Sequence, residues 1–108
     1  MAQSAGTILV VEDAVVSNFL KVALTQRGYE VICAQAADAQ VFIRDAVRKI
    51  DLLITNVPAA FAEFPDLPLL YMAALPDPEA IQPFRRCLSL RKPFHTAQLF
   101  ATMEQLLT

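Results

Sequence analysis

Short apolar runs alternate along this chain with segments whose apolar residues recur at helical spacing. The short runs cover residues 8–11, 29–34, 52–55, 68–73 and 88–90 and are rich in Val, Ile and Leu. The segments with helical spacing cover residues 14–27, residues 38–50 and a C-terminal stretch around residues 99–107. Strands that alternate with helices favour a parallel sheet with helices on both of its faces.

Glycine, proline and aspartate predict where these elements begin and end. Gly28 follows the first helical segment as a stop signal, and Asp38 stands where the second helix is expected to be capped. Asp77 followed by Pro78 is typical of a helix start. Because Pro83 lies inside that segment, the fourth helix is expected to be short or distorted.

The crossover between the third and fourth strands is too short for a regular helix. It consists of residues 57–67 and contains Pro58 and Pro65. A parallel crossover with a helix takes at least about 10–12 residues, and proline interrupts helices. We therefore expect a loop, with at most one turn around residues 59–63. Phe61 and Phe64 then either fold back over the sheet surface that the missing helix leaves bare, or form part of a partner-binding patch.

The composition describes one domain of 108 residues, which is long enough for a single core. A hydrophobic content of 56% argues against disorder, and a net charge of -2 gives no reason to expect nucleic-acid binding. No apolar run approaches the roughly 18 residues of a membrane span. Residues 1–6 lack the basic start of a signal peptide, so we expect a loose tail, then a domain over residues 7–108, and a cytoplasmic location.

Cys33 and Cys87 match no metal-binding spacing and are expected to be buried.

Three motifs at strand ends resemble the receiver domain of bacterial two-component response regulators. The first strand ends in Ile8-Leu-Val-Val-Glu-Asp13, the third in Asp51-Leu-Leu-Ile-Thr-Asn56, and the fifth is followed by Arg91-Lys-Pro-Phe94. The resemblance covers about residues 7–107. It implies a flavodoxin-like (CheY-like) α/β fold with five parallel strands in the order 2-1-3-4-5, here with the helix between strands three and four missing or reduced to a loop.

In that family, two acids after the first strand hold a magnesium ion, an aspartate ending the third strand accepts a phosphoryl group, and a hydroxyl residue and a lysine contact that group. Glu12 and Asp13 match the acids, and Lys92 matches the lysine. Asn56 stands at the acceptor position and Ala73 at the hydroxyl position. Because a neutral amide is a poor nucleophile, the resemblance implies a degenerate receiver that lacks its phosphoacceptor.

Two interpretations of the acidic pair stay open. Glu12 and Asp13 offer carboxylates to Mg²⁺, but Asn56 adds only a neutral carbonyl, and magnesium gives up its water reluctantly. We therefore expect weak metal binding or an unfilled site, and no other cofactor. In the second interpretation, the acids pair with Lys92 and hold the domain in one fixed state. Ser89 stands where the family has an aromatic switch residue, which agrees with a fixed state.

The resemblance implies signalling by contact rather than enzymatic activity. Without an acceptor, the domain is expected to bind a histidine kinase, a phosphotransfer protein, another response regulator or a second copy of itself. Val15, Val16, Phe61 and Phe64 are the candidate contact residues. His95, the single histidine, is expected to lie exposed at a helix start rather than to act as a general base.

A basic cluster leaves a second function open. Arg85, Arg86, Arg91 and Lys92 fall within eight positions. Arginine side chains bind phosphate oxygens in a bidentate manner, so the domain could instead sense a nucleotide messenger or another anion. The alternative for this cluster is a solvated face. A flavodoxin-type electron carrier is disfavoured, because the acids after the first strand would repel the phosphate of its cofactor.

Overall fold

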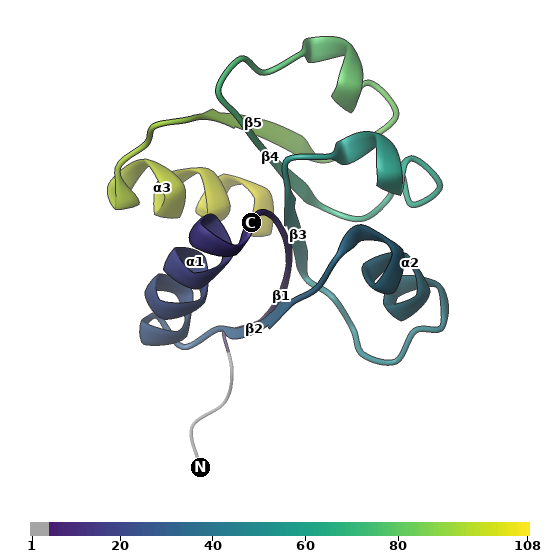
Figure 1. The fold of residues 1–108 in the computed structure, drawn as a ribbon, viewed down its shortest axis with the longest axis horizontal. Coiled ribbons are helices and arrows are strands. Elements are labelled where there is room, and N and C mark those ends of the chain that lie inside the picture. The colour runs from purple at the N-terminus through teal and green to yellow at the C-terminus, as the bar shows by residue number, and fades with distance from the viewer. Residues whose placement is uncertain (1–4) are drawn as a thin grey trace.

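The computed structural model describes residues 5–108, which form a parallel five-stranded sheet with helices on both faces (Figure 1). The strands are β1 (Thr7–Val11), β2 (Glu30–Cys33), β3 (Leu52–Thr55), β4 (Leu69–Ala73) and β5 (Cys87–Arg91). The helices are α1 (Ala14–Gln26), α2 (Ala36–Arg44) and α3 (Thr96–Leu107), with short 3-10 helices η1 (Pro58–Phe61) and η2 (Pro78–Ile81). The strand order β2-β1-β3-β4-β5 confirms the prediction. Within the described chain, no helix is long and apolar enough to cross a membrane.

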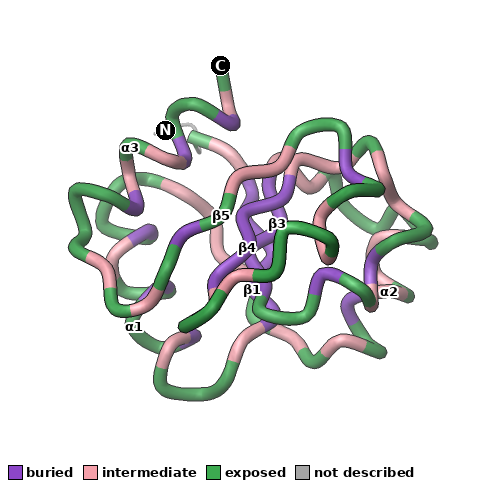
Figure 2. The backbone as a smooth tube through the Cα atoms, turned by 90° about the horizontal axis from the view of Figure 1, so that it is seen from above, coloured by how far each residue is buried: buried purple, intermediate pink, exposed green. Residues whose placement is uncertain are grey.

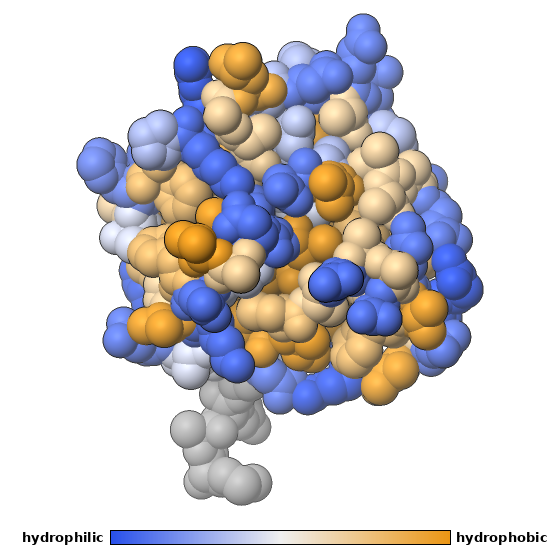
Figure 3. Space-filling view, in the orientation of Figure 1, coloured by the Kyte–Doolittle hydropathy of each residue, from blue (hydrophilic) through white to orange (hydrophobic). Residues whose placement is uncertain are grey.

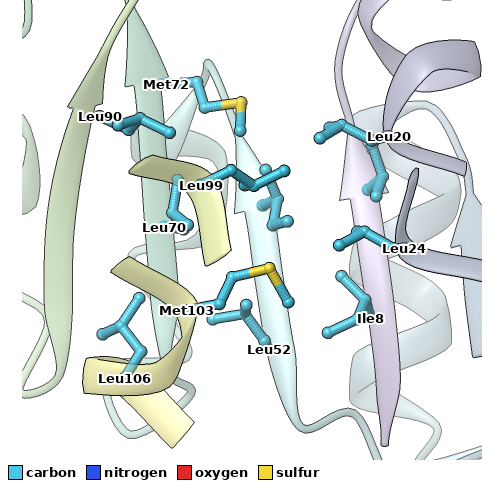
Figure 4. Packing of buried hydrophobic residues seen from close by; sticks show 12 residues of the cluster. Ile8, Leu20, Leu24, Leu52, Leu70, Met72, Leu90, Leu99, Met103 and Leu106 are labelled. Atoms are coloured by element: carbon cyan, nitrogen blue, oxygen red, sulfur yellow. The ribbon is translucent and has the colours of Figure 1, made fainter. Parts of the chain in front are cut away.

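The sheet separates two apolar cores. Alternate residues of a strand point to opposite faces, so β1, β3 and β4 supply side chains to both cores. These strands are buried along their length except at Ala73, the last residue of β4 (Figure 2). One core lies between the sheet and helices α1 and α3, where leucines from both helices meet the strands (Figure 4). The other lies under α2, η1 and η2 and contains Leu9, Leu53, Phe61, Tyr71 and Phe84.

The crossover between β3 and β4 contains the single turn that its length and prolines predict. Phe61, at the end of η1, is fully buried in the second core, and Phe64 is half-buried against the same core. Burying a phenylalanine side chain contributes about 1.5–3 kcal/mol, and the sheet surface left bare by the missing helix needs a cover. The two rings provide that cover. The prediction that Phe61 contacts a partner is therefore wrong, because no part of its side chain reaches the surface.

The second helix is shorter than its apolar pattern predicts. The pattern extends over residues 38–50, but α2 begins at Ala36 and ends at Arg44. Asp38 lies in the first turn of α2 and not at its cap. Shortly after the helix, Ala46 has a φ of 50°, in the left-handed region that an L-residue adopts only at a cost. The remainder of the apolar pattern therefore follows an irregular segment.

The predicted N-terminal tail is described only in part, because residues 1–4 lie outside the described residues. The next two residues are hydrogen-bonded to the start of β2. The backbone N–H of Ala5 donates to the carbonyl of Gly28 at 2.9 Å, and that of Glu30 donates to the carbonyl of Gly6 at 2.9 Å. Gly28 lies two residues beyond the end of α1 and has a φ of 92°, as expected of a glycine that follows a helix.

The two cysteines are less buried than expected. Cys33 is exposed at the end of β2, an edge strand, and Cys87 is half-buried at the start of β5, the other edge strand. Burial raises the pKa of the Cys87 thiol from 9.0 to about 11. Partial burial also raises the pKa of Cys33, and the nearby charge of Lys21 opposes that shift.

Candidate functional site

The carboxyl edge of the sheet brings together four residues that the sequence singles out. Glu12 and Asn56 directly follow the paired last residues of β1 and β3. Ala73 ends β4, and the backbone N–H of Lys92 donates to its carbonyl at 2.8 Å. Carboxyl ends of parallel strands lie at one edge of a sheet, where α/β folds of this kind place their sites. The four predicted positions therefore form one group.

The ion pair between Glu12 and Lys92 is the central contact of this group. Lys92 Nζ lies 2.8 Å from Glu12 Oε2, and the side chain of Glu12 is 0% exposed while that of Lys92 is 25% exposed. Glu12 Oε1 accepts a hydrogen bond from the backbone N–H of Asp13 at 3.1 Å. Among the described residues, Oε2 has no hydrogen bond of good geometry, so the lysine charge is its polar partner. A buried carboxylate needs such a counter-charge.

Asp13 turns away from this ion pair. Its Oδ1 accepts a hydrogen bond from the backbone N–H of Val16 at 3.0 Å and so caps the N-terminus of α1. The sequence contains the signal for this role, an aspartate directly before the first helical residue, although its position in the acidic pair draws attention first. Of the two acids, only Glu12 forms an ion pair with Lys92 in the described structure.

The acidic pair does not fit a magnesium ion in this conformation. Magnesium requires oxygen ligands in near-octahedral arrangement at about 2.0–2.1 Å. Here one carboxylate faces an ammonium group and the other faces a helix terminus. Within residues 5–108, no three His, Cys, Asp or Glu side chains are grouped closely enough to hold a metal.

Asn56 lies exposed immediately beyond the buried end of β3. Thr55 is fully buried, and its Oγ1 accepts a hydrogen bond from the backbone N–H of Val57 at 3.0 Å. This bond fixes the turn that carries the chain from β3 into η1. Asn56 is thereby held at the rim of the group in an accessible place.

An apolar groove adjoins the ion pair on the side of α1. It has a volume of about 400 Å³ and is lined by Val15, Val16, Phe19, Lys92, Pro93 and Phe94. The rings of Phe19 and Phe94 pack at a centroid distance of 6.2 Å and an angle of 59°. Figure 3 shows apolar side chains at the surface on the side of the molecule where α1 lies. Sequence reasoning identified Val15 and Val16 but missed Phe19, which follows Val15 by one helical turn on the same face.

The arginines of the predicted anion site lie at the two ends of β5. Arg85 is ion-paired with Asp66 at 2.6 Å, and the guanidinium of Arg86 donates to the carbonyl of Leu106 at the end of α3. Both precede β5, whereas Arg91 is its last residue. At about 3.3 Å per residue, the strand places Arg86 and Arg91 roughly 16 Å apart. Arg91 thus lies apart from Arg85 and Arg86 along β5, and an anion site on these arginines stays a prediction.

Tyr71 is a buried aromatic residue that sequence reasoning missed. It lies on β4 directly beside Ser89 of β5, the position where the resemblance places an aromatic switch residue. The ring is almost fully buried, and its hydroxyl oxygen accepts a hydrogen bond from the backbone N–H of Asp77 at 3.4 Å. An aromatic side chain from the neighbouring strand thus joins the sheet to the loop before η2. In the sequence, only its position inside an apolar strand indicated that Tyr71 is buried.

His95 lies exposed directly before α3, as predicted. Its backbone N–H donates to Gln98 Oε1 at 2.7 Å, which closes the first turn of the helix.

Solved structures similar to this one include receiver domains and response regulators. The signal receiver domain of an HD domain-containing protein from Pseudomonas fluorescens Pf-5 has a TM-score of 0.77 and 22% identity, over 99% of this chain and 90% of that chain. A two-component response regulator from Clostridium difficile has a TM-score of 0.79 and 20% identity, over 97% of this chain and 96% of that chain. The chemotaxis protein CheY4 from Vibrio cholerae has a TM-score of 0.75 and 20% identity, over 97% of this chain and 100% of that chain. No protein-family model matches the sequence, and no curated protein matches it. At these identities the similarity establishes the fold, which is the CheY-like fold of receiver domains.

Proposed function

We propose that this chain is a degenerate receiver domain that acts in two-component or phosphorelay signalling through protein contact, without being phosphorylated. The observation that carries the proposal is the ion pair between Glu12 and Lys92. Phosphoryl transfer depends on cations that neutralise the charge of the phosphoryl oxygens. Here the lysine that would serve this purpose is already neutralised by a buried carboxylate.

The neighbouring positions support the same proposal. Asn56 offers a neutral amide where the family has the nucleophilic carboxylate. Ala73 has no hydroxyl group to donate to a phosphoryl oxygen. A magnesium ion would have to displace Lys92 from Glu12 and detach Asp13 from α1. We therefore infer that neither magnesium nor a phosphoryl group is the input.

A receiver without these inputs stays in one conformation. A ligand shifts a conformational equilibrium only if it binds the two states with different affinity, and here the family's usual ligand has lost its site. The domain then acts as a constitutive docking module in the cytoplasm, with no enzymatic activity of its own. Its proposed partners are a histidine kinase, a phosphotransfer protein or another response regulator. Val15 and Val16 in the groove beside Lys92 are the proposed contact residues.

Phosphorylation and binding assays on the intact chain test this function. We expect no acid-labile phosphate after incubation with acetyl phosphate and Mg²⁺, or with purified histidine kinases of the same cell. We expect a kinase or phosphotransfer protein to bind equally well with and without Mg²⁺ and phosphodonor. Acid-labile phosphate on the wild-type chain would contradict the proposal.

A matched pair of variants locates the contact. Val15→Glu places a charge in the groove and should weaken partner binding. Val41→Glu places the same charge on α2, where Val41 is half-exposed in the opposite layer, and should leave binding unchanged. Equal effects of the two variants would remove the groove from the proposal.

A further inference from the structure

The loops that follow the strands carry an excess of negative charge. Together with the last residue of β5 and the first turns of the helices that they enter, these loops contain five acids and two cations, which are Glu12, Asp13, Asp38, Asp77 and Glu79 against Arg91 and Lys92. Their negative excess is larger than the net charge of -2 of the whole chain. The carboxyl edge of the sheet is therefore more negative than the remainder of the molecule.

The structure leaves most of these acids without a counter-charge. Lys92 lies 2.8 Å from the buried Glu12, so this cation and this acid neutralise each other. Asp13, Asp77 and Glu79 are exposed, and none of the ion pairs between described residues includes them. The carboxylate of Asp13 already occupies the positive end of helix α1. An anion that approaches this edge therefore meets exposed carboxylates and a lysine that is already paired.

The groove that we propose as the partner site opens onto this edge. Its lining includes Val15, at the start of α1, and Lys92, directly after β5. Asp13 stands two residues before Val15, and Asn56 lies exposed at the end of the adjacent strand β3. Charges act over a Debye length of about 8 Å at physiological ionic strength. The edge therefore influences any charged group that a protein bound in the groove presents to it.

We propose that the groove selects the unphosphorylated form of its partner, an inference that rests on the proposed function. A phosphoryl group adds a charge of about -1.5 to -2. Proteins that take up such a group neutralise its oxygens with cations, but here the lysine is held by a buried carboxylate. Like charges brought together at an interface weaken binding. A partner whose phosphoryl group faces this edge therefore binds less tightly than the same partner without the group.

This selectivity gives the chain a regulatory effect on its partner. The coupling free energy between two binding events is reciprocal. A chain that binds the unphosphorylated partner more tightly shifts the phosphorylation equilibrium of that partner toward the unphosphorylated form by the same factor. The chain is thereby an inhibitor that lowers the supply of phosphoryl groups to other receivers, and it needs no acceptor residue for this effect.

Titration calorimetry of the full chain tests the selectivity. The probe is a purified histidine phosphotransfer domain from the same cell, before and after chemical phosphorylation with phosphoramidate. We expect phosphorylation of the probe to raise the dissociation constant about fivefold or more. At 1 M salt, where the Debye length is about 3 Å, the two constants should converge. Equal constants at low salt, or tighter binding of the phosphorylated probe, would overturn the inference and leave the proposed docking intact. Absence of binding by both forms would overturn the proposed function and the inference with it.

A matched pair of double variants assigns the selectivity to the edge. Asp77→Asn with Glu79→Gln removes two negative charges beside the edge and keeps an oxygen at position 77 to cap η2. Asp45→Asn with Glu104→Gln removes two negative charges elsewhere, at the end of α2 and on α3. The first pair should reduce the preference for the unphosphorylated probe at least about twofold, and the second should leave it unchanged. Equal effects of the two pairs would overturn the inference.

Alkylation of a thiol introduced by Asn56→Cys measures the charge of the edge without a partner. Iodoacetate is an anion and iodoacetamide is neutral, so the ratio of their rates reports the local potential. We expect this ratio to be at least about twofold lower in the folded chain than in urea, and to recover when Asp77→Asn and Glu79→Gln are added. Peptide mass spectrometry separates position 56 from Cys33 and Cys87. A ratio in the folded chain that equals or exceeds the ratio in urea would overturn the inference, even if the phosphotransfer domain binds.

Discussion

Lys92 Nζ lies 2.8 Å from Glu12 Oε2, and the glutamate side chain has no exposed surface. Removing the lysine charge leaves a buried carboxylate without a partner. We expect Lys92→Met to lower the free energy of unfolding by about 1–3 kcal/mol, less than for a fully buried pair because Lys92 retains some contact with water. Urea unfolding of the variant measures the loss.

Two further variants distinguish the loss of the Glu12–Lys92 ion pair from the general effect on stability of replacing a lysine. Glu12→Gln combined with Lys92→Met removes both charges and should recover most of the lost stability. Lys49 forms an exposed pair with Asp51 at 3.7 Å, so Lys49→Met should cost less than about 0.5 kcal/mol. If the two single lysine variants lose equal stability, the buried pair is not a special contact.

Asp13 caps helix α1 in this structure. The effects of substituting it should therefore differ from those expected if its charge formed an ion pair. Asparagine caps helices as well as aspartate does, whereas alanine at a cap costs about 1 kcal/mol. Asp13→Asn should therefore leave the thermal midpoint nearly unchanged, and Asp13→Ala should lower it. An equal loss in both variants would show that the charge of Asp13, and not its capping oxygen, stabilises the domain.

Phe61 covers the sheet where the crossover helix is missing. Because it is fully buried, Phe61→Ala should lower the free energy of unfolding by about 3–5 kcal/mol. Phe64→Ala should cost less, since Phe64 is only half-buried. Chemical unfolding compares the two. A Phe61→Ala variant with wild-type stability would contradict the role of this ring as a cover.

Local sequence signals predicted the sheet and the shortened crossover, because both depend on short-range rules. Pro58 and Pro65 exclude a regular helix wherever the crossover lies in space. Whether Phe61 covers the sheet or faces a partner depends on the bare surface beneath it, which exists only after the strands have assembled. The sequence therefore left two alternatives, and the tertiary structure decides between them.

The residues of the site show where proximity along the chain misleads. Arg86 and Arg91 are close in sequence, but β5 runs between them, and an extended strand separates its ends more than a helix or turn does. Glu12 and Asp13 are adjacent, yet one faces the buried lysine and the other caps α1. The resemblance of the three motifs to receiver domains was sufficient to predict the group at the sheet edge. The direction of each side chain depends on where the neighbouring helix begins.

Cys87 provides a test of burial at the start of β5. Burial raises the pKa of its thiol to about 11, so at pH 8 only about one thiol in a thousand is the reactive thiolate. In the folded protein, Cys33, which is exposed, should react with a thiol reagent first and Cys87 more slowly. Unfolding in urea should remove the difference. Equal rates in the folded protein would contradict the burial of Cys87.

The same pKa shift predicts how stability depends on pH. A thiol whose pKa is raised in the folded state favours folding while it stays protonated, so its contribution is complete below pH 9.0 and is lost as the pH rises toward 11. Stability should therefore fall across this interval, and less steeply in Cys87→Ala. An identical slope in that variant would assign the loss to other groups.

Asn56→Asp should not restore efficient phosphorylation by itself. The substitution supplies a nucleophile in an accessible place at the end of β3, but Lys92 remains paired with Glu12 and Asp13 remains at the cap of α1. Each missing electrostatic contact to a transferred group costs on the order of 100-fold in rate. The rate of acid-labile phosphate formation from acetyl phosphate and Mg²⁺ should thus stay at least about 100-fold below that of an intact receiver. Adding Ala73→Thr should increase the rate, because the hydroxyl can then donate to a phosphoryl oxygen. If Asn56→Asp alone reaches the rate of an intact receiver, the Glu12–Lys92 pair does not block phosphoryl transfer.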